Sequence, residues 1–306
     1  MTTKENYKKF CESHSDISIF LSWKWINFVC NDFKIFEFYQ NGKIAFLILP
    51  IEKKIGFTII RNPLLSPYCG FLFENGFNEN EKKLTAKNLL SQIPKANEIH
   101  LDFHPDYFIS NFNTIKNIST KNTYKLQLIV EEKIYINFKD SLKRQIKKGE
   151  KNLTIESTRD INLLYNLYLK SQLKQKNKII ISIKELQKIA EWGFAENCMR
   201  IDVVKNEHGD YLAASLLCYD KITSYYLLGG ADPNFSNSGA MSYLLWQQIR
   251  ISIALQKTYF DFEGSMIKGV AKFFSNFGAS IYNYNSMQEN SSGIYGILKK
   301  IKNKIY

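Results

Sequence analysis

Phe260–Gly278 reads FDFEGSMIKGVAKFFSNFG, an aromatic stretch that carries two carboxylates at its start. From Tyr259 to Glu263, aromatic and acidic residues alternate with the period of a β-strand. The alternation predicts that Asp261 and Glu263 share one face of the strand, and that the two phenylalanines beside them share the other. Carboxylates on an apolar strand are candidates for proton transfer, because burial raises the pKa of a carboxyl group.

The residues upstream, 225–249, read YYLLGGADPNFSNSGAMSYLLWQQI. A strand is predicted over Thr223–Leu228, followed by a loop rich in Gly, Asp, Pro, Asn and Ser, and then by a helix that begins at Gly239 or Ala240. Together with the strand at 259–263, these segments form a crossover unit. The N-terminus of its helix directs free backbone N–H groups into the loop, which is therefore a predicted site for an anionic ligand.

This order of segments resembles motif A and the following strand of the GNAT acyltransferases. The runs GAMSYLLWQQI, YFDFEGS and KFFSNFG more closely resemble the C-terminal half of the double-GNAT proteins, the branch that includes the Fem, or methicillin-resistance, aminoacyltransferases. The resemblance implies an α+β (mixed α/β) fold of two tandem GNAT-like domains, each with a mixed, mostly antiparallel sheet flanked by helices. We place these domains at 1–135 and 136–306.

The rest of the chain supports this architecture. Two alternating runs joined at Asn41 and Gly42 predict a β-hairpin. Helices are expected from about Lys139 to Lys148, where basic residues cluster, and from Ser182, where Glu185 completes a capping box. Residues 200–230 contain three strand-like runs joined by polar turns, and three antiparallel strands before a helix and a strand are the order of a GNAT sheet.

The composition gives a formal net charge of +12 and a pI near 9.2. This charge suits an anionic partner such as a nucleotide, a transfer RNA or an acidic membrane surface. An AT-rich genome explains the same charge without any selection for binding, because only five of the 41 basic residues are arginine. The basic cluster between Lys143 and Lys151 has the same two explanations, a phosphate-binding patch or a solvated helix face, with RNA binding without catalysis as a further hypothesis.

The N-terminus has no apolar leader segment, and no later stretch approaches the roughly 18 apolar residues of a membrane span. A soluble, cytoplasmic protein is therefore expected. The five cysteines are odd in number and never spaced as CxxC, which predicts reduced thiols. No metal site is expected, since His100 and His104 lie on a predicted strand where side chains four apart are about 13 Å from each other.

Acyl transfer to an amine requires a polarised acyl carbonyl and a base for one proton. The resemblance implies that the carbonyl lies where the strand ending near Leu227–Gly230 diverges from the strand at Tyr259–Glu263, so that a backbone N–H stabilises the oxyanion. Glu263, or else Asp261, would take the amine proton; alternatively, both carboxylates bond loop N–H groups or pair with lysines. The residues expected to hold the donor are Leu228, Ser236, Asn237, Ser238, Gly239 and Ala240.

Four further residues are expected to contact substrate: Arg61, Tyr68, Arg144 and Tyr226. Arg61 and Tyr68 belong to a proline-rich segment that resembles the part of double-GNAT proteins that closes over the cleft, although shaping a loop would explain them equally well. Arg144 lies in the basic cluster. The C-terminal residues form an apolar stripe opposite lysines, which fits either docking on the protein or peripheral contact with an anionic membrane. The stripe consists of Ile294, Ile297, Leu298, Ile301 and Ile305.

The donor motifs depart from both families. The GNAT pyrophosphate loop has Arg or Gln, then Gly three residues later, then Gly or Ala, where this chain has Ser236, Gly239 and Met241. Fem enzymes have a lysine where this chain has Phe274, and Lys272 lies two residues away. The preferred function is therefore transfer of an acyl group from an acyl-CoA co-substrate to an amine, on a small molecule or on a cell-envelope or glycan precursor.

Besides RNA binding without catalysis, two alternatives remain open beside that function. Aminoacyl-tRNA could replace acyl-CoA as the donor, as in the Fem enzymes. The chain could also be a GNAT-fold binding module that has lost catalysis. No tightly bound cofactor and no DNA partner are expected under any of these hypotheses.

Overall fold

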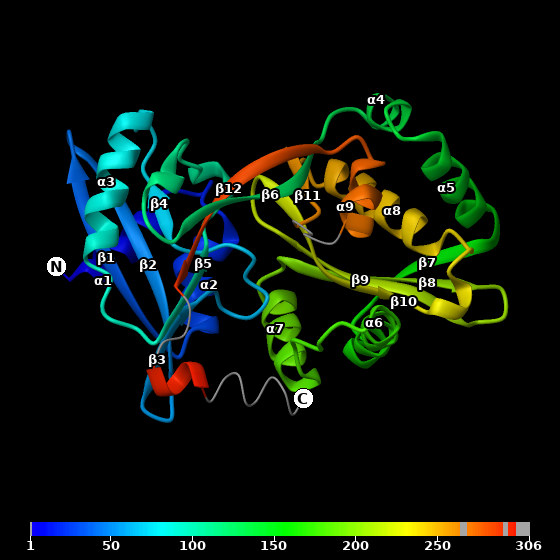
Figure 1. Ribbon diagram of the computed structural model, residues 1–306. Helices are drawn as coiled ribbons and strands as arrows, with labels where there is room; N and C mark the ends of the chain where they lie inside the picture. The colour runs from blue at the N-terminus through cyan, green and yellow to red at the C-terminus, as the bar shows by residue number, and fades with distance from the viewer. Residues whose placement is uncertain (1, 264–267, 290–292, 298–306) are drawn as a thin grey trace. The chain divides into compact units, whose positions relative to one another are not determined.

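The computed structural model of the protein describes residues 2–263, 268–289 and 293–297 (Figure 1). The chain folds into two compact units. The first unit contains residues 1–122 and the residues from 282 onward, and the second unit contains residues 123–281. The C-terminal strand thus returns to the first unit, which the expected domains 1–135 and 136–306 do not anticipate.

The first unit is built on a mixed, mostly antiparallel sheet. Its strands follow the order β1-β2-β3-β5-β12, with β4 also paired to β2, and only the β3–β5 pair is parallel. Its elements are α1 (Thr3–Ser13), η1 (Ile19–Leu21), α2 (Trp23–Val29), β1 (Asp32–Gln40), β2 (Lys43–Lys54), β3 (Phe57–Arg61), β4 (Phe71–Phe73), α3 (Glu79–Ser91), β5 (Glu98–Asp102), η2 (Pro105–Tyr107), η3 (Phe112–Thr114), the start of β6 (Ile118–Gln127) and most of β12 (Ser280–Glu289).

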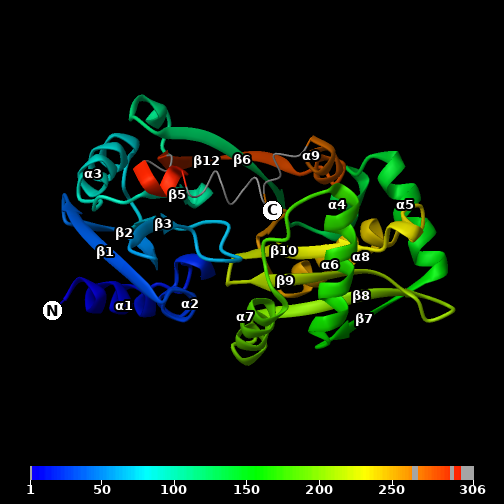
Figure 2. The same ribbon diagram turned by 60° about the horizontal axis from the view of Figure 1, so that its bottom comes forward.

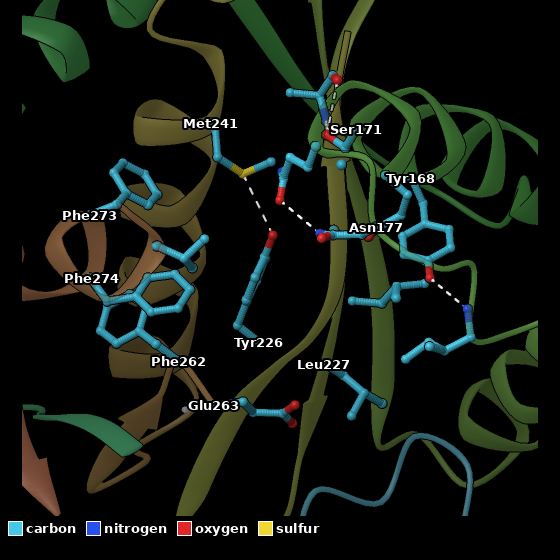
Figure 3. A pocket seen from close by; sticks show the side chains of 18 of the residues that line it. Tyr168, Ser171, Asn177, Tyr226, Leu227, Met241, Phe262, Glu263, Phe273 and Phe274 are labelled. Atoms are coloured by element: carbon cyan, nitrogen blue, oxygen red, sulfur yellow. Dashed lines mark hydrogen bonds between the residues drawn. The ribbon is translucent and has the colours of Figure 1, made fainter. Parts of the chain in front are cut away.

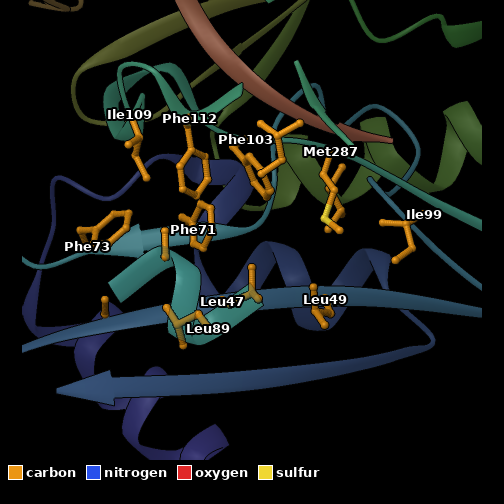
Figure 4. Close-up of a cluster of buried hydrophobic side chains, with 14 of the residues drawn as sticks. Leu47, Leu49, Phe71, Phe73, Leu89, Ile99, Phe103, Ile109, Phe112 and Met287 are labelled. Carbon is orange, nitrogen blue, oxygen red and sulfur yellow. The ribbon is translucent and has the colours of Figure 1, made fainter. Parts of the chain in front are cut away.

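The predicted hairpin joins β1 to β2. Gln40 pairs with Lys43, so Asn41 and Gly42 form a two-residue turn, and both have positive φ, of 51° and 76°. That turn matches the right-handed twist of the flanking strands. The core of this unit lies between the sheet and α3, where Leu47 and Phe71 pack with Leu89 and other buried side chains (Figure 4).

The second unit has a sheet of order β6-β11-β10-β9-β8-β7, in which only β10 and β11 are parallel. Helices α6 and α7 cover one face of this sheet, and α5 and α8 cover the other (Figure 1). Its remaining elements are α4 (Glu131–Ile136), α5 (Asp140–Asn152), β7 (Leu153–Thr158), α6 (Ile161–Gln175), α7 (Ile183–Ala195), β8 (Met199–Asn206), β9 (Tyr211–Tyr219), β10 (Thr223–Ala231), η4 (Pro233–Phe235), α8 (Ala240–Ala254), β11 (Tyr259–Asp261) and α9 (Lys268–Ser275).

Several sequence predictions are confirmed in this unit. The basic helix is α5, with Leu142 and Ile146 buried, and α7 begins with the predicted capping box of Ser182 and Glu185. The three strand-like runs are β8, β9 and β10, joined antiparallel. The crossover helix is α8, with Gly239 at its N-cap.

A buried polar network fixes α8 against the sheet. Asp202 on β8 is fully buried and accepts a hydrogen bond from Gln248 Nε2 on α8 at 3.0 Å. The Arg200 guanidinium also donates to the Asp202 carboxylate, at 2.6 to 3.1 Å. Because a buried charge is tolerated only when it is paired, this network ties the register of α8 to β8 and so positions the N-terminus of α8.

Candidate active site

The parallel strands β10 and β11 separate beside the predicted carboxylates. Their pairing ends at Tyr225 and Asp261, and β10 continues to Ala231. Within this continuation, the register against β9 shifts between Tyr226 and Leu228, so Leu227 is the extra residue of a β-bulge. Bulges bend a strand and change the direction of its neighbouring groups, and this one lies where the family resemblance implies an acyl carbonyl.

A cavity of about 740 Å³ opens at this separation (Figure 3). Phe262, Phe273 and Phe274 form one side of it, and α6 forms the opposite side with Tyr168 and other polar residues. Its full lining is Tyr168, Ser171, Gln172, Gln175, Asn177, Lys178, Ile180, Tyr226, Leu227, Leu228, Gly229, Gly230, Ala231, Met241, Phe262, Glu263, Val270, Phe273 and Phe274.

Glu263 contributes the carboxyl group of this cavity. Its backbone has left-handed φ, of 53°, so the expected strand ends at Asp261 and does not reach Glu263. The prediction that both carboxylates lie on one strand face is therefore wrong. Instead, Asp261 Oδ1 accepts a hydrogen bond from Glu263 N at 2.9 Å, which turns the chain and directs Glu263 into the cavity.

Asp261 is fully buried and acts as a local anchor. Besides the Glu263 N–H, its Oδ1 accepts a hydrogen bond from Thr123 Oγ1 of β6 at 2.7 Å. Through these two hydrogen bonds, Asp261 stabilises the turn that leads to Glu263. The alternative considered for both carboxylates, bonding to loop N–H groups, thus applies to Asp261.

The environment of Glu263 favours the protonated carboxyl. Its Oε1 atom is buried, and none of the described residues bonds to it. Burial, and then the negative charge of Asp261, raise the pKa of Glu263 well above the usual 4.5. A carboxyl group whose pKa is moved toward neutrality is a usable general base near physiological pH.

This shift predicts a pH-dependent stability. Above pH 4.5 the unfolded chain releases the Glu263 proton while the folded protein retains it, so the free energy of unfolding falls as the pH rises toward the folded-state pKa. Glu263→Gln has no proton to lose at this position. The variant should match the wild type near pH 4.5 and gain on it by up to about 1.4 kcal/mol per pH unit within that window. Urea unfolding of both proteins between pH 5 and 8 measures the difference, and parallel profiles would contradict the assignment.

Tyr226 lies in the middle of the cavity. Its hydroxyl contacts Met241 Sδ at 3.9 Å, and the ring folds back over Gly229, where an added Cβ would lie 2.1 Å from that hydroxyl. Burial and the nearby charge of Glu263 raise the pKa of the tyrosine. Tyr226 therefore stays a neutral hydrogen-bond donor in the same cavity as Glu263, and its contact with substrate stays a prediction.

The predicted donor loop adjoins the same cavity. A smaller cavity of about 230 Å³ is lined by Ser236, Ser238, Gly239 and Ala240, and it shares Ala231, Met241 and Phe273 with the larger one. Ala240 N donates to Ser238 Oγ at 3.2 Å, and Lys148 Nζ donates to the Asn237 carbonyl at 2.7 Å. The loop thus combines hydroxyl groups, the N-terminus of a 15-residue helix and a lysine, a set that fits an anionic group.

Gly239 is required in that loop for two reasons. Its φ of +83° belongs to the left-handed region that favours glycine, and a Cβ there would lie 2.3 Å from the Gln145 carbonyl oxygen of α5. Compared with the GNAT pyrophosphate loop, this loop has different residues at the first and last positions, Ser236 and Met241. It keeps the glycine between them, which the backbone conformation requires.

The other expected substrate residues lie elsewhere. Tyr68 is only 1% exposed and packs edge-on against His104 and Tyr284 within the first unit. Arg61, in the same unit, forms an ion pair with Glu52. Arg144 is exposed on α5 and is not among the lining residues of the two cavities. The substrate roles of these three residues stay predictions.

Sequence analysis missed the polar wall that α6 gives to the cavity. Tyr168, Ser171, Gln172 and Gln175 recur with helical spacing, which was the available signal. Ser171 also exchanges hydrogen bonds with the backbone of Ala231, at 2.9 and 3.1 Å, in the part of β10 that pairs with β9 and no longer with β11.

A family model described as acetyltransferase (GNAT) domain matches residues 137–273, which include α6, the donor loop, Glu263 and most of α9. This part of the chain is thus similar to GNAT acetyltransferase domains. The protein is accordingly a transferase, as the resemblance implied. No curated protein matches the chain in sequence.

Solved structures confirm the double-GNAT fold. A structure of FemX is similar over 98% of both chains, with a TM-score of 0.65 and 13% identity. L-PGS from Bacillus licheniformis is similar over 94% of this chain and 92% of its own, with a TM-score of 0.53 and 13% identity. A tandem GNAT protein from the clavulanic acid biosynthesis pathway covers 87% and 86%, with a TM-score of 0.52 and 7% identity. At these identities the likeness concerns the fold alone.

Two further findings bear on partners. Among the described residues, no helix is long and apolar enough to cross a membrane. The predicted C-terminal stripe from Leu298 onward lies outside the described residues, while Ile294 and Ile297 are 71% and 60% exposed.

Proposed function

We propose that this protein transfers an acyl group from an acyl-CoA to an amine, with Glu263 as the general base. The observation that carries this proposal is the Glu263 carboxyl, whose buried Oε1 atom no described residue bonds, inside a cavity that opens where β10 separates from β11. A site that keeps a carboxyl desolvated but unpaired favours the uptake of a proton during the reaction.

In the proposed reaction, the amine nitrogen attacks the thioester carbonyl carbon and forms the new C–N bond. Backbone N–H groups of the bulged segment Leu227–Gly230 stabilise the oxyanion. Glu263 takes the proton from nitrogen, and collapse of the intermediate breaks the C–S bond, so that the thiol leaves after gaining a proton. Tyr226, a neutral donor in the same cavity, hydrogen-bonds the substrate.

The donor phosphates are assigned to the loop Ser236–Ala240. Leu228 lines the main cavity, and Ser236, Ser238, Gly239 and Ala240 line the smaller cavity beside it. An acyl-CoA would place its thioester in the former and its pyrophosphate at the latter. Acyl-CoA is preferred over aminoacyl-tRNA because the Fem lysine position is Phe274, which is buried against Phe262 with ring centroids 5.0 Å apart, and Lys272 is exposed outside both linings.

The acceptor class is proposed to be an amine on a cell-envelope or glycan precursor, with a cytoplasmic site of action. Charged tRNA is the second candidate donor, favoured by the similarity to FemX and by the basic helix α5. A binding module without catalysis is the third candidate. It predicts no effect of either donor.

The melting temperature of the protein, measured with each candidate donor, tests which donor binds. A ligand that binds only the folded protein stabilises it by about 2.7 kcal/mol at a hundred times its Kd. We expect acetyl-CoA or longer acyl-CoAs to raise the melting temperature by several degrees, and uncharged or charged tRNA to leave it unchanged. Gly239→Ala should abolish the shift.

Gly209→Ala is the matched control for this experiment. Gly209 has nearly the same φ, +85°, but its Cβ would meet no described atom within 4 Å, so the variant carries the same backbone strain without blocking the loop. A shift retained by Gly239→Ala would contradict the assignment of the loop. A shift with charged tRNA alone would establish the second candidate, and no shift with either donor would favour the binding module.

A further inference from the structure

Aliphatic side chains are exposed at the end of α6 and in the connection from α6 to α7, which borders the main cavity. Leu173, Ile179 and Ile180 are 68%, 47% and 67% exposed. Ile180 also lines the cavity, together with Asn177 and Lys178 of the same connection. Figure 2 shows α6 and α7, the helices that it joins, in front of the sheet.

The last residues of α6, the connection and the first turns of α7 are together strongly basic. Residues 173–188 contain five lysines, at positions 174, 176, 178, 184 and 188, and a single acidic residue, Glu185. That carboxylate is used internally, because it bonds the backbone N–H and hydroxyl of Ser182 in the capping box at 2.8 and 2.7 Å. The segment therefore combines exposed aliphatic tips with a net positive charge.

A second exposed aliphatic group provides a contrast. Ile129, Val130 and Ile136 are 45%, 55% and 71% exposed, but Glu131 and Glu132 lie between them in the chain. An anionic surface would repel this group and attract the connection between α6 and α7. Exposure alone therefore does not distinguish the two groups, whereas the sign of the charge does.

We propose that residues 173–188 bind the surface of an anionic phospholipid bilayer. The aliphatic side chains would enter the interface between headgroups and acyl chains, and the lysines would lie among the phosphates. Aliphatic tips favour a bilayer over RNA, since nucleic acids are bound with aromatic stacking and arginine. Because this segment borders the main cavity, an amine acceptor held in the bilayer would reach Glu263 from there; this last step rests on the proposed function.

Vesicle co-sedimentation of the full chain tests the proposal without any donor or acceptor. We expect binding to phosphatidylcholine vesicles that contain about 30% phosphatidylglycerol, little binding to phosphatidylcholine alone, and loss of binding at high salt. Lys174→Glu combined with Lys176→Glu should lower the partition coefficient by at least about 20-fold, since each cation near the surface contributes roughly fivefold. Ile179→Ser combined with Ile180→Ser should lower it by about tenfold.

Two control variants match these changes. Ile136→Ser removes an exposed isoleucine beside acidic residues, and Lys147→Glu with Lys151→Glu reverses two exposed charges on α5. Each should change the partition coefficient by less than about threefold, once the lower net charge of the α5 variant is taken into account. The proposal would be overturned if the wild type did not bind the anionic vesicles. It would also be overturned if the variants at 174/176 and 179/180 bound as well as the wild type, or if the α5 variant lost more binding than they did. None of these outcomes depends on whether the protein transfers an acyl group.

Discussion

Glu263→Gln is expected to lower kcat for amine acylation by about a hundred- to ten-thousand-fold, the usual contribution of a general base. The amide has nearly the shape of the carboxyl group but cannot accept the amine proton. KM for the acyl donor should change little, because the proposed site of the donor phosphates is the loop Ser236–Ala240, away from Glu263. Steady-state kinetics with the donor identified by melting and a panel of amines measures both parameters.

The pH profile separates a base from a merely structural carboxyl. In the wild type, kcat/KM should rise with pH through the raised pKa of Glu263, because only the ionised carboxylate accepts a proton. Glu263→Gln should lose this acidic limb along with most of the rate. A variant that keeps the wild-type profile with a modest loss of rate would show that Glu263 is not the base.

Asp261→Asn is the companion variant. Asn Oδ1 can still accept hydrogen bonds from Thr123 and from the Glu263 N–H, so the turn should persist. Loss of the neighbouring negative charge removes the second cause of the raised pKa at Glu263 and should move the acidic limb to lower pH. An unmoved limb in a folded Asp261→Asn protein would mean that another group titrates.

Much of the fold could be predicted because its signals are local. The turn at Asn41 and Gly42, the capping box at Ser182 and the amphipathic pattern of α5 each specify an element within a few residues of sequence. The crossover from β10 through α8 to β11 carries the family resemblance, and the family model covers all of it.

The site was only partly predictable because its decisive features are not local. The position of Glu263 depends on the bond from its N–H to Asp261, which ends a strand that the alternation would continue. The polar wall on α6 lies opposite β10 only after the sheet has formed. The return of β12 to the first unit likewise depends on pairing with β5, which lies far upstream in the chain.

The second large effect is expected at Gly230, where α6 meets β10. A Cβ added there would lie 2.4 Å from the Leu167 carbonyl oxygen and 2.5 Å from Tyr168 Cα, and both are backbone atoms that cannot rotate away. Gly230→Ala should therefore lower the free energy of unfolding by about 3 kcal/mol, the upper range for overpacking. Chemical denaturation of the wild type and the variant measures this loss.

The matched control is Gly269→Ala, near the start of α9. Neither glycine has positive φ, and a Cβ at Gly269 would meet no described atom within 4 Å. Because alanine favours a helix over glycine by about 1 kcal/mol, this variant should be unchanged or slightly more stable. The comparison isolates the steric contact from the backbone preference of glycine.

The same contact should also matter for activity. The backbone at Gly230 sets how close α6 lies to β10, and α6 supplies Tyr168, Ser171 and Gln172 to the cavity wall. Where Gly230→Ala remains folded, at low temperature or with a stabilising donor, a displaced α6 should raise KM for the amine more than it lowers kcat, because Glu263 lies on the other side of the cavity (Figure 3). A variant with wild-type stability and KM would show that α6 is free to shift, and that its polar wall does not need this close approach.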